Sequence, residues 1–226
     1  MAGAGPSRII AVRHGESEAN LAHREAGDRP LVYGLGDDEV RLTALGRRQS
    51  AALGRLLAAL PGGERPEAVW CSPYLRARET WEVAKDDWGA GLPVTVDERL
   101  RDQEQGAFDR LNPAAVRERF PEEAARREAV GGYAFRPPGG ESLADVVTRV
   151  RAFVRDLAGP AAGRPVLIVA HDSVVLALRH VLESGVDAAP HPGPPFAPVL
   201  NASVSAWRAV EGSFELVRFN DVGHLA

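Results

Sequence analysis

The sequence has a single cysteine, Cys71, among 226 residues. One cysteine cannot form an internal disulfide, and a thiolate zinc site needs several cysteines at short spacing. The histidines also lack the short spacing of paired metal ligands. These absences exclude a disulfide scaffold, and we expect no bound metal. They also fit a reducing compartment, so we expect a cytoplasmic protein.

An excess of one charge is missing as well. Lysine and arginine number 27 and aspartate and glutamate 31, and the two signs are mixed along the chain. Because nucleic-acid-binding domains usually carry a basic patch, no nucleic acid partner is expected. No stretch approaches the roughly 18 apolar residues of a membrane span, and the first residues lack an export signal, so no membrane association is expected. The expected partner is a small molecule, and nothing in the sequence indicates an oligomeric state.

Short apolar runs rich in β-branched residues alternate with helical patterns. Hydrophobic residues make up 45% of the chain, enough for a sizeable core. The runs typical of strands are RIIAV, EAVWCS, PVTVD, PVLIVAH, SVSAWRAV and FELVRF. Such alternation predicts an α/β fold, a three-layer α/β/α arrangement with a mostly parallel central sheet. The last two runs predict a hairpin at one edge of the sheet.

Two regions interrupt this alternation. Residues 101–140 are charged, partly helical and too long for a simple connection, so they predict a lid or cap over a site. Residues 184–200 have the proline density of an irregular surface loop. Neither region resembles a linker between independent units. We therefore interpret residues 1–226 as a single domain with a helical lid insertion.

Polar side chains follow several predicted strands at their carboxyl ends. Arg13 and His14 follow the first strand, Arg76 follows the second, and His171 follows PVLIVA. In open parallel sheets ligands bind beyond these strand ends. Guanidinium groups pair with phosphate oxygens, and a neutral imidazole can attack phosphorus, so this set suits a phosphoryl group.

Each of these residues also has an ordinary explanation. A lone histidine at a strand end is more often hydrogen-bonded or exposed than nucleophilic, and a helical arginine is usually solvated. The interpretation therefore depends on convergence. The remaining histidines are assigned to the surface: His23, His180, His191 and His224.

Five motifs, in order along nearly the whole chain, resemble those of the histidine phosphatase superfamily. They are RHGESEAN, LTALGRRQS, SPYLRARET, PPGGESLADVVTRV and LIVAHD. This superfamily includes cofactor-dependent phosphoglycerate mutases, acid phosphatases and fructose-2,6-bisphosphatases. The resemblance favours the phosphatase branch, with similarity to the fructose-2,6-bisphosphatase domains.

The resemblance implies that His14 is the nucleophile and becomes a phosphohistidine. Arg13, Arg76 and His171 would bind the phosphoryl oxygens, and Asn20 would add a hydrogen bond. No metal or other cofactor is implied, because the cationic side chains supply its electrostatic role. The second ring nitrogen of His14 should donate to a fixed acceptor, such as a backbone carbonyl, which sets the tautomer.

The family usually supplies the proton for the leaving oxygen from a glutamate in a Leu-x-Glu-x-x-x-Gly segment. Here that segment is LRDQEQG, which places Asp102 at the acid position and Glu104 two residues later. We favour Asp102, with Glu104 as the alternative. Asp172 is a second departure, because the family often has glycine there. A carboxylate facing the phosphate would repel it, so we expect Asp172 to point away or to hold a neighbouring group.

The segment before residue 141 resembles the fructose-2,6-bisphosphatase pattern Arg-x-Pro-x-Gly-Glu-Ser. That would place Tyr133 and Arg136 near a second anionic or sugar group; the alternative is a tyrosine packed under the lid and a solvated arginine. Leu176 stands where that group has arginine, which argues against a fructose bisphosphate.

We expect a metal-independent phosphatase of a small phosphomonoester, such as a sugar phosphate. The alternatives are phosphoglycerate mutase-type transfer and a phospho-ligand binding protein of the same fold without turnover.

Overall fold

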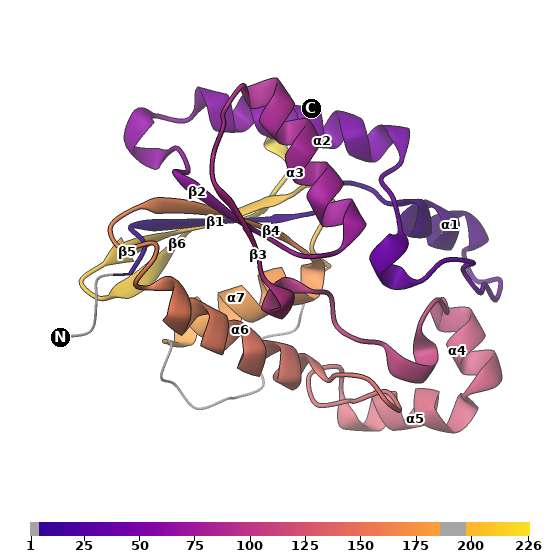
Figure 1. The fold of residues 1–226 in the computed structure, drawn as a ribbon. Helices are drawn as coiled ribbons and strands as arrows, with labels where there is room; N and C mark the ends of the chain where they lie inside the picture. The colour runs from indigo at the N-terminus through magenta and orange to yellow at the C-terminus, as the bar shows by residue number, and fades with distance from the viewer. Residues whose placement is uncertain (1–4, 186–197) are drawn as a thin grey trace.

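The computed structural model describes residues 5–185 and 198–226, and a six-stranded sheet lies at its centre (Figure 1). The strand order is β3-β2-β4-β1-β5-β6. The first four strands are parallel to one another, β5 is antiparallel to β1, and β6 is antiparallel to β5. All six predicted strands are present, and the edge hairpin is confirmed. The strands are β1 (Arg8–Arg13), β2 (Ala68–Cys71), β3 (Val94–Val96), β4 (Pro165–Ala170), β5 (Val204–Val210) and β6 (Ser213–Asp221).

Helices cover both faces of the sheet. Helices α2 and α3 lie on one face and α6 and α7 on the other, while α4 and α5 extend beside α1 at one end of the molecule (Figure 1). The three-layer α/β/α prediction is therefore confirmed. The helices are α1 (Glu18–Ala26), α2 (Ala44–Ala59), α3 (Leu75–Trp88), α4 (Pro113–Arg119), α5 (Pro121–Val130), α6 (Leu143–Leu157) and α7 (Asp172–Ser184).

Strand β1 shows why an uninterrupted apolar run forms a central strand. Successive side chains of a strand point to opposite faces. Ile9 and Ala11 pack in the cluster formed with α6 and α7, whereas Ile10 and Val12 pack in the cluster formed with α2 and α3. Both faces are covered, so the four buried positions between the terminal arginines are all apolar.

The helix starts follow from capping residues in the sequence. The Thr43 side chain accepts from Gly46 N at the start of α2. Ser142 and Asp145 form a reciprocal capping box at the start of α6. These caps fix where each helix begins, and hence where the preceding loop meets the sheet edge.

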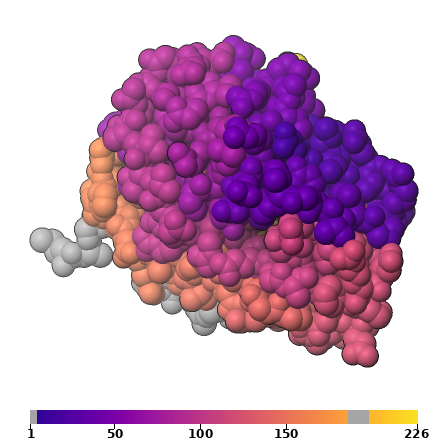
Figure 2. All heavy atoms as spheres, turned by 45° about the vertical axis from the view of Figure 1, so that its right-hand side comes forward, coloured from indigo at the N-terminus to yellow at the C-terminus, as the bar shows by residue number. Residues whose placement is uncertain are grey.

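Residues 101–140 form the part of the fold that the alternating pattern does not include. They contain α4 and α5 and a small apolar cluster of Phe108, Val116 and Phe135, separate from the two main clusters. Figure 2 shows this segment beside the segment around α1 on one face of the molecule. Most of the predicted proline-rich loop, residues 186–197, lies outside the described residues. Within the described part of the chain, no helix is both long and apolar enough to cross a membrane.

Candidate active site

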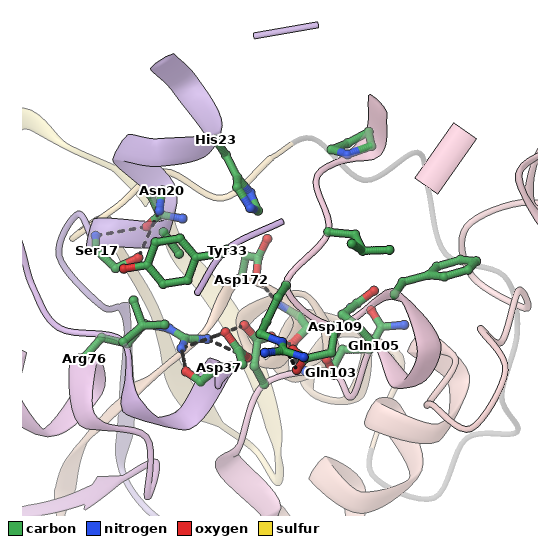
Figure 3. A pocket seen from close by; sticks show the side chains of 18 of the residues that line it. Ser17, Asn20, His23, Tyr33, Asp37, Arg76, Gln103, Gln105, Asp109 and Asp172 are labelled. Carbon is green, nitrogen blue, oxygen red and sulfur yellow. Dashed lines mark hydrogen bonds and ion pairs between the residues drawn. The ribbon is translucent and has the colours of Figure 1, made fainter. Parts of the chain in front are cut away.

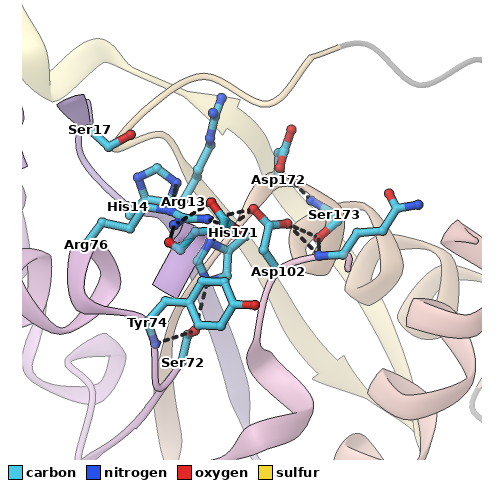
Figure 4. Close-up of polar contacts among 12 residues, drawn as sticks. Arg13, His14, Ser17, Ser72, Tyr74, Arg76, Asp102, His171, Asp172 and Ser173 are labelled. Atoms are coloured by element: carbon cyan, nitrogen blue, oxygen red, sulfur yellow. Dashed lines mark hydrogen bonds and ion pairs between the residues drawn. The ribbon is translucent and has the colours of Figure 1, made fainter. Parts of the chain in front are cut away.

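Three neighbouring strand ends bring the predicted residues together. Strands β2, β4 and β1 are adjacent and parallel, so the loops that follow them leave the same edge of the sheet. His14 follows β1, His171 follows β4, and Arg76 lies in the first turn of α3 after β2. The His14 and His171 ring centroids are 5.3 Å apart (Figure 4). The convergence expected from the sequence is present.

The His14 ring is buried and held in one tautomer. Its Nδ1 lies 2.7 Å from the Gly15 carbonyl oxygen, and Arg76 Nε donates to its Nε2 at 3.1 Å. Because Nε2 accepts, the ring proton is on Nδ1, as the sequence analysis expected. The residue is 2% exposed; burial lowers the pKa of the imidazole well below the usual value, and the nearby Arg76, His171 and Arg13 lower it further. The imidazole is therefore neutral, with a lone pair on Nε2.

Glycines fix the loop that carries His14. A Cβ on Gly46 would lie 2.1 Å from the Glu16 carbonyl oxygen, and a Cβ on Gly15 would lie 2.5 Å from the Gly46 carbonyl oxygen. The Thr43 amide donates to the same Glu16 carbonyl at 3.0 Å. The Glu16 side chain pairs with Arg24 and accepts from Thr43 Oγ1. The LTALG motif thus gives the start of α2 close backbone contact with the nucleophile loop.

Arg76 is buried and surrounded by acceptors. Besides the bond to His14, its NH1 contacts the Asp37 backbone oxygen and Oδ1, and its NH2 donates to Asp37 Oδ2 and Asp102 Oδ2 at 3.1 and 3.0 Å. The sequence analysis did not single out Asp37. It lies in a loop that faces α3, outside every motif, so no sequence signal pointed to it.

His171 is buried at the N-terminus of α7. Its Nε2 lies 2.8 Å from Ser72 Oγ, and its Nδ1 lies 3.4 Å from Asp102 Oδ2. Burial lowers the pKa of His171 to about 3, although the Asp102 carboxylate opposes the shift. The site therefore contains two neutral imidazoles.

Asp102, and not Glu104, faces the cluster. Its carboxylate accepts from Ser173 Oγ at 2.6 Å and from Gln103 N at 2.8 Å, in addition to Arg76 (Figure 4). Burial alone would raise the pKa of Asp102, but His171, Arg76 and these hydrogen bonds hold it well below its usual value. The Glu104 side chain is 48% exposed and pairs with Arg101 at 2.8 Å, and it contacts neither histidine.

Arg13, Asn20 and Asp172 line the same cavity. Arg13 NH1 donates to the Val199 carbonyl oxygen, while its Nε is buried without a hydrogen-bond partner in the described part of the chain. Asn20 Oδ1 accepts from Ser17 N and Asn201 Nδ2, which leaves the Asn20 amide group as a donor.

The Asp172 carboxylate accepts from Ser173 N at 3.0 Å, and burial and the nearby Asp102 raise its pKa. The hydrogen bond to Ser173 N corresponds to the second option expected from the sequence, that Asp172 holds a neighbouring group.

The cavity has a volume of about 530 Å³ and lies between α1, the loop carrying Asp37, residues 101–116 and α7 (Figure 3). Its outer wall includes polar residues that the sequence analysis missed: His23, Tyr33, Gln103, Asp109, Arg110 and Arg127. His23 had been assigned to the surface. His180 had too, but it is buried, and His191 lies outside the described residues.

The structure does not bring Tyr133 and Arg136 to this cavity. Tyr133 packs against the core beside His180, with ring centroids 5.9 Å apart. The Arg136 side chain is 60% exposed and pairs with Asp145 at 2.6 Å. Both placements match the alternative interpretation, a packed tyrosine and a solvated arginine. A sequence motif shared with a relative fixed their position along the chain but not the direction of their side chains.

Comparison with known proteins places this geometry in a family. The sequence profile of the histidine phosphatase superfamily (branch 1) matches residues 9–222. A phosphoglycerate mutase-like protein of Arabidopsis thaliana is 35% identical over 159 residues, which are 67% of this chain but only 46% of the relative. A 2,3-bisphosphoglycerate-dependent phosphoglycerate mutase of Azorhizobium caulinodans is 34% identical over 77% of this chain and 81% of its own length.

Two further comparisons concern phosphatases. A 6-phosphofructo-2-kinase/fructose-2,6-bisphosphatase of Caenorhabditis elegans is 31% identical over 75% of this chain and 33% of its own length. The structure of a mycobacterial glucosyl-3-phosphoglycerate phosphatase superposes with a TM-score of 0.72, at 28% identity, and covers 95% of this chain and 98% of that one. Together with the profile match over almost the whole sequence, these similarities show that the chain belongs to branch 1 of the histidine phosphatase superfamily.

Proposed function

We propose that the protein is a phosphatase that hydrolyses a small phosphomonoester, such as a sugar phosphate, through a phosphohistidine at His14. One observation carries the proposal: His14 is a buried, neutral imidazole whose Nε2 lies at the floor of a cavity beside Arg76 and His171. A fixed lone pair next to cationic and hydrogen-bonding groups is what an attack on phosphorus requires.

In the first step His14 Nε2 attacks phosphorus, and the bond from phosphorus to the ester oxygen breaks. The leaving oxygen takes a proton from the Asp102 carboxyl group and departs as an alcohol. In the second step the Asp102 carboxylate draws a proton from water as that water attacks the phosphohistidine. Phosphate leaves, Nε2 regains its lone pair, and Asp102 is again protonated.

Asp102 must therefore hold a proton at the first step, whereas its low pKa keeps it ionised in the empty site. The groups that lower this pKa include Arg76 and His171, the same groups that would bind the phosphoryl oxygens. A bound phosphoryl dianion engages these groups and adds negative charge nearby, so the pKa of Asp102 rises when substrate binds.

The second candidate is phosphoglycerate mutase-type transfer, which the mutase relatives favour. It shares the first step but returns the phosphoryl group to a sugar acid instead of water. Two features favour the phosphatase: the aspartate at the acid position, and the segment after Asn20, which lacks the usual sequence pattern of phosphoglycerate mutases. A phospho-ligand binding protein without turnover is the third candidate, suggested by the same aspartate and by Asp172.

The proposed partner is a small phosphoester, consistent with the cavity volume of about 530 Å³. We also propose that the protein works in the cytoplasm, since its single cysteine, Cys71, is buried and unpaired.

A panel of phosphorylated metabolites, assayed for phosphate release with EDTA present, tests the proposal. We expect release from at least one ester and a ³²P label on His14 after rapid quenching of a labelled substrate. Isomerisation of 3-phosphoglycerate without phosphate release would favour the mutase. Tight phosphate binding without hydrolysis of an aryl phosphate, whose leaving group hardly needs an acid, would favour the binding protein.

A further inference from the structure

Every nitrogen of the Arg76 guanidinium already contacts an acceptor. A guanidinium has five N–H groups: one on Nε and two on each terminal nitrogen. Here they face five acceptors: His14 Nε2, the backbone oxygen and both carboxylate oxygens of Asp37, and Asp102 Oδ2. Attack by His14 Nε2 releases the Nε–H of Arg76, but the two terminal nitrogens, which form the fork that binds a phosphate, can take phosphoryl oxygens only by giving up a contact to Asp37 or Asp102.

Asp37 is the acceptor best placed to be replaced. Its carboxylate binds both terminal nitrogens of Arg76 in a two-pronged arrangement, the geometry in which a phosphate would bind the same fork (Figure 3). It is carried by a single-turn helix, Asp37–Glu39, whose residues are not buried, and its side chain is 38% exposed. Asp102, in contrast, is held by Ser173 and Gln103 as well as by Arg76.

The charge balance around Arg76 makes the replacement depend on protons. In the empty site one guanidinium is shared by two carboxylates, and Asp109 lines the same cavity. A phosphoryl dianion would add two negative charges to this group. Because negative charges that lie close together repel one another, the bound dianion favours protonation of one of these carboxylates.

We propose that Asp37 is a positioning residue that holds Arg76 in the empty site, yields it to the incoming phosphoryl group, and takes up a proton as it does so. The inference rests on the proposed function in one respect, that Arg76 receives the phosphoryl oxygens. It goes beyond that function by adding a second carboxylate, which controls access to the arginine and links phosphate binding to pH.

The groups that face Asp37 support this assignment of the proton. Arg76 and the Tyr74 ring face it from α3 and the turn before it, and Asp102 and Asp109 face it from the segment after β3. Burial raises the pKa of Asp37, Asp102 and Asp109 raise it further, and Arg76 opposes them. The pKa of Asp102 is shifted downward. Asp37 is therefore the first of the pair to take a proton.

Calorimetry with tungstate tests the proposal, because tungstate stays a tetrahedral dianion near neutral pH and contributes no proton of its own. Titrations in buffers of different ionisation enthalpy report how many protons the protein takes up on binding. We expect uptake by the wild type and an affinity that falls as pH rises, by up to about tenfold per pH unit for one proton. Binding without uptake would overturn the proposal, and this measurement needs no variant.

The variant Asp37→Asn tests whether Asp37 is the residue that takes up the proton. The amide keeps the shape but carries no charge, so the proton taken up at Asp37 should be lost, only uptake by Asp102 should remain, and tungstate should bind about tenfold or more tightly near pH 8. Asp38→Asn, in the same turn and exposed, is the matched control and should behave as wild type. If Asp37→Asn folds poorly, as judged by circular dichroism, Asp37→Ser replaces it. Uptake or affinity unchanged in a folded Asp37 variant, or uptake lost only in Asp102→Asn, would contradict the assignment.

Arg76→Ala separates this inference from the function on which it rests. Tungstate binding unaffected by Arg76→Ala would show that the phosphoryl group does not use this arginine, and the proposed function would fail with it. Binding that needs Arg76 but takes up no proton would leave the phosphatase intact and remove only the role of Asp37.

Discussion

At the scale of single residues, burial is what makes His14 suitable for its proposed role. An exposed histidine has a pKa near 6.5 and is partly protonated under mildly acidic conditions. Burial of the ring and the surrounding cations keep it neutral, and the Gly15 carbonyl leaves the lone pair on Nε2. Neither the Nδ1 tautomer nor the burial is a property of the residue type itself; both come from the loop.

His14→Ala should lower kcat by several orders of magnitude, because the covalent route loses its nucleophile while the oxyanion-binding groups remain. The measurement is the hydrolysis of an aryl phosphate, together with tungstate binding to show that the cavity is preserved. Activity within tenfold of wild type would contradict the nucleophile assignment.

Asp102→Asn should slow hydrolysis of alkyl phosphates much more than that of aryl phosphates, because an alkoxide needs a proton to leave and a phenolate hardly does. Glu104→Gln is the matched control: its side chain is half exposed and pairs with Arg101, and the substitution should affect neither substrate. If Glu104→Gln, and not Asp102→Asn, selectively slows the alkyl phosphates, Glu104 is the proton donor. The comparison is kcat for the two substrate classes in each variant.

At the scale of elements, close packing of α2 against α3 fixes the position of the His14 loop relative to Arg76. A Cβ on Gly54 of α2 would lie 2.3 Å from the Ala84 carbonyl oxygen of α3. The same α2 begins at the loop that carries His14, and the same α3 carries Arg76. A shift between these helices would therefore move the nucleophile relative to its arginine.

Gly54→Ala should lower the free energy of unfolding by about 1–3 kcal/mol, the usual range for overpacking, despite the better helix propensity of alanine. Urea denaturation gives the value. Gly62→Ala is the control, since nothing lies within 4 Å of the added Cβ and its φ is ordinary, so its stability should match that of wild type. Equal stability of both variants would contradict the prediction, because it would show that the contact between α2 and α3 accommodates the added methyl group at no cost.

The elements differ in how well the sequence predicts them. The central strands β1, β2 and β4 are clear from uninterrupted apolar runs, because both of their faces are covered, whereas β3 and β6 contain polar residues and have no buried residue. The 101–140 segment was predicted only as a partly helical lid. Its short helices are held by a local cluster around Phe108 and Phe135, whose members are widely spaced in the sequence and follow no simple period.

At the scale of the whole molecule, the cavity joins segments that are far apart along the chain. Residues from the loop after β1, from α3, from 101–116 and from α7 all contribute. A ligand that binds between them links these segments in the folded state only. Binding to the native state alone stabilises a protein by RT ln(1 + [L]/Kd), about 2.7 kcal/mol at a ligand concentration of 100 Kd.

Tungstate at such a concentration should raise the thermal midpoint by several degrees for a chain of this size. Scanning calorimetry or fluorescence of the four tryptophans would measure it. Arg76→Ala should show a clearly smaller shift at the same tungstate concentration. A midpoint that does not move with tungstate would mean that the cavity does not bind phosphate-like dianions.

By itself, the sequence determined the fold class, the order of the strands along the chain and the place of His14, Arg76 and His171 at strand ends. These follow from local patterns: apolar runs, capping residues and short motifs that act over a few positions.

Only the tertiary structure decided that Asp102 and not Glu104 faces the cluster, that Asp37 holds Arg76, and that Tyr133 and Arg136 do not line the cavity. These outcomes depend on the path of loops and on contacts between residues tens of positions apart, as in the pair of Asp37 and Arg76. Side-chain direction in an irregular loop is set by what packs against it, and the sequence of the loop alone does not contain that information.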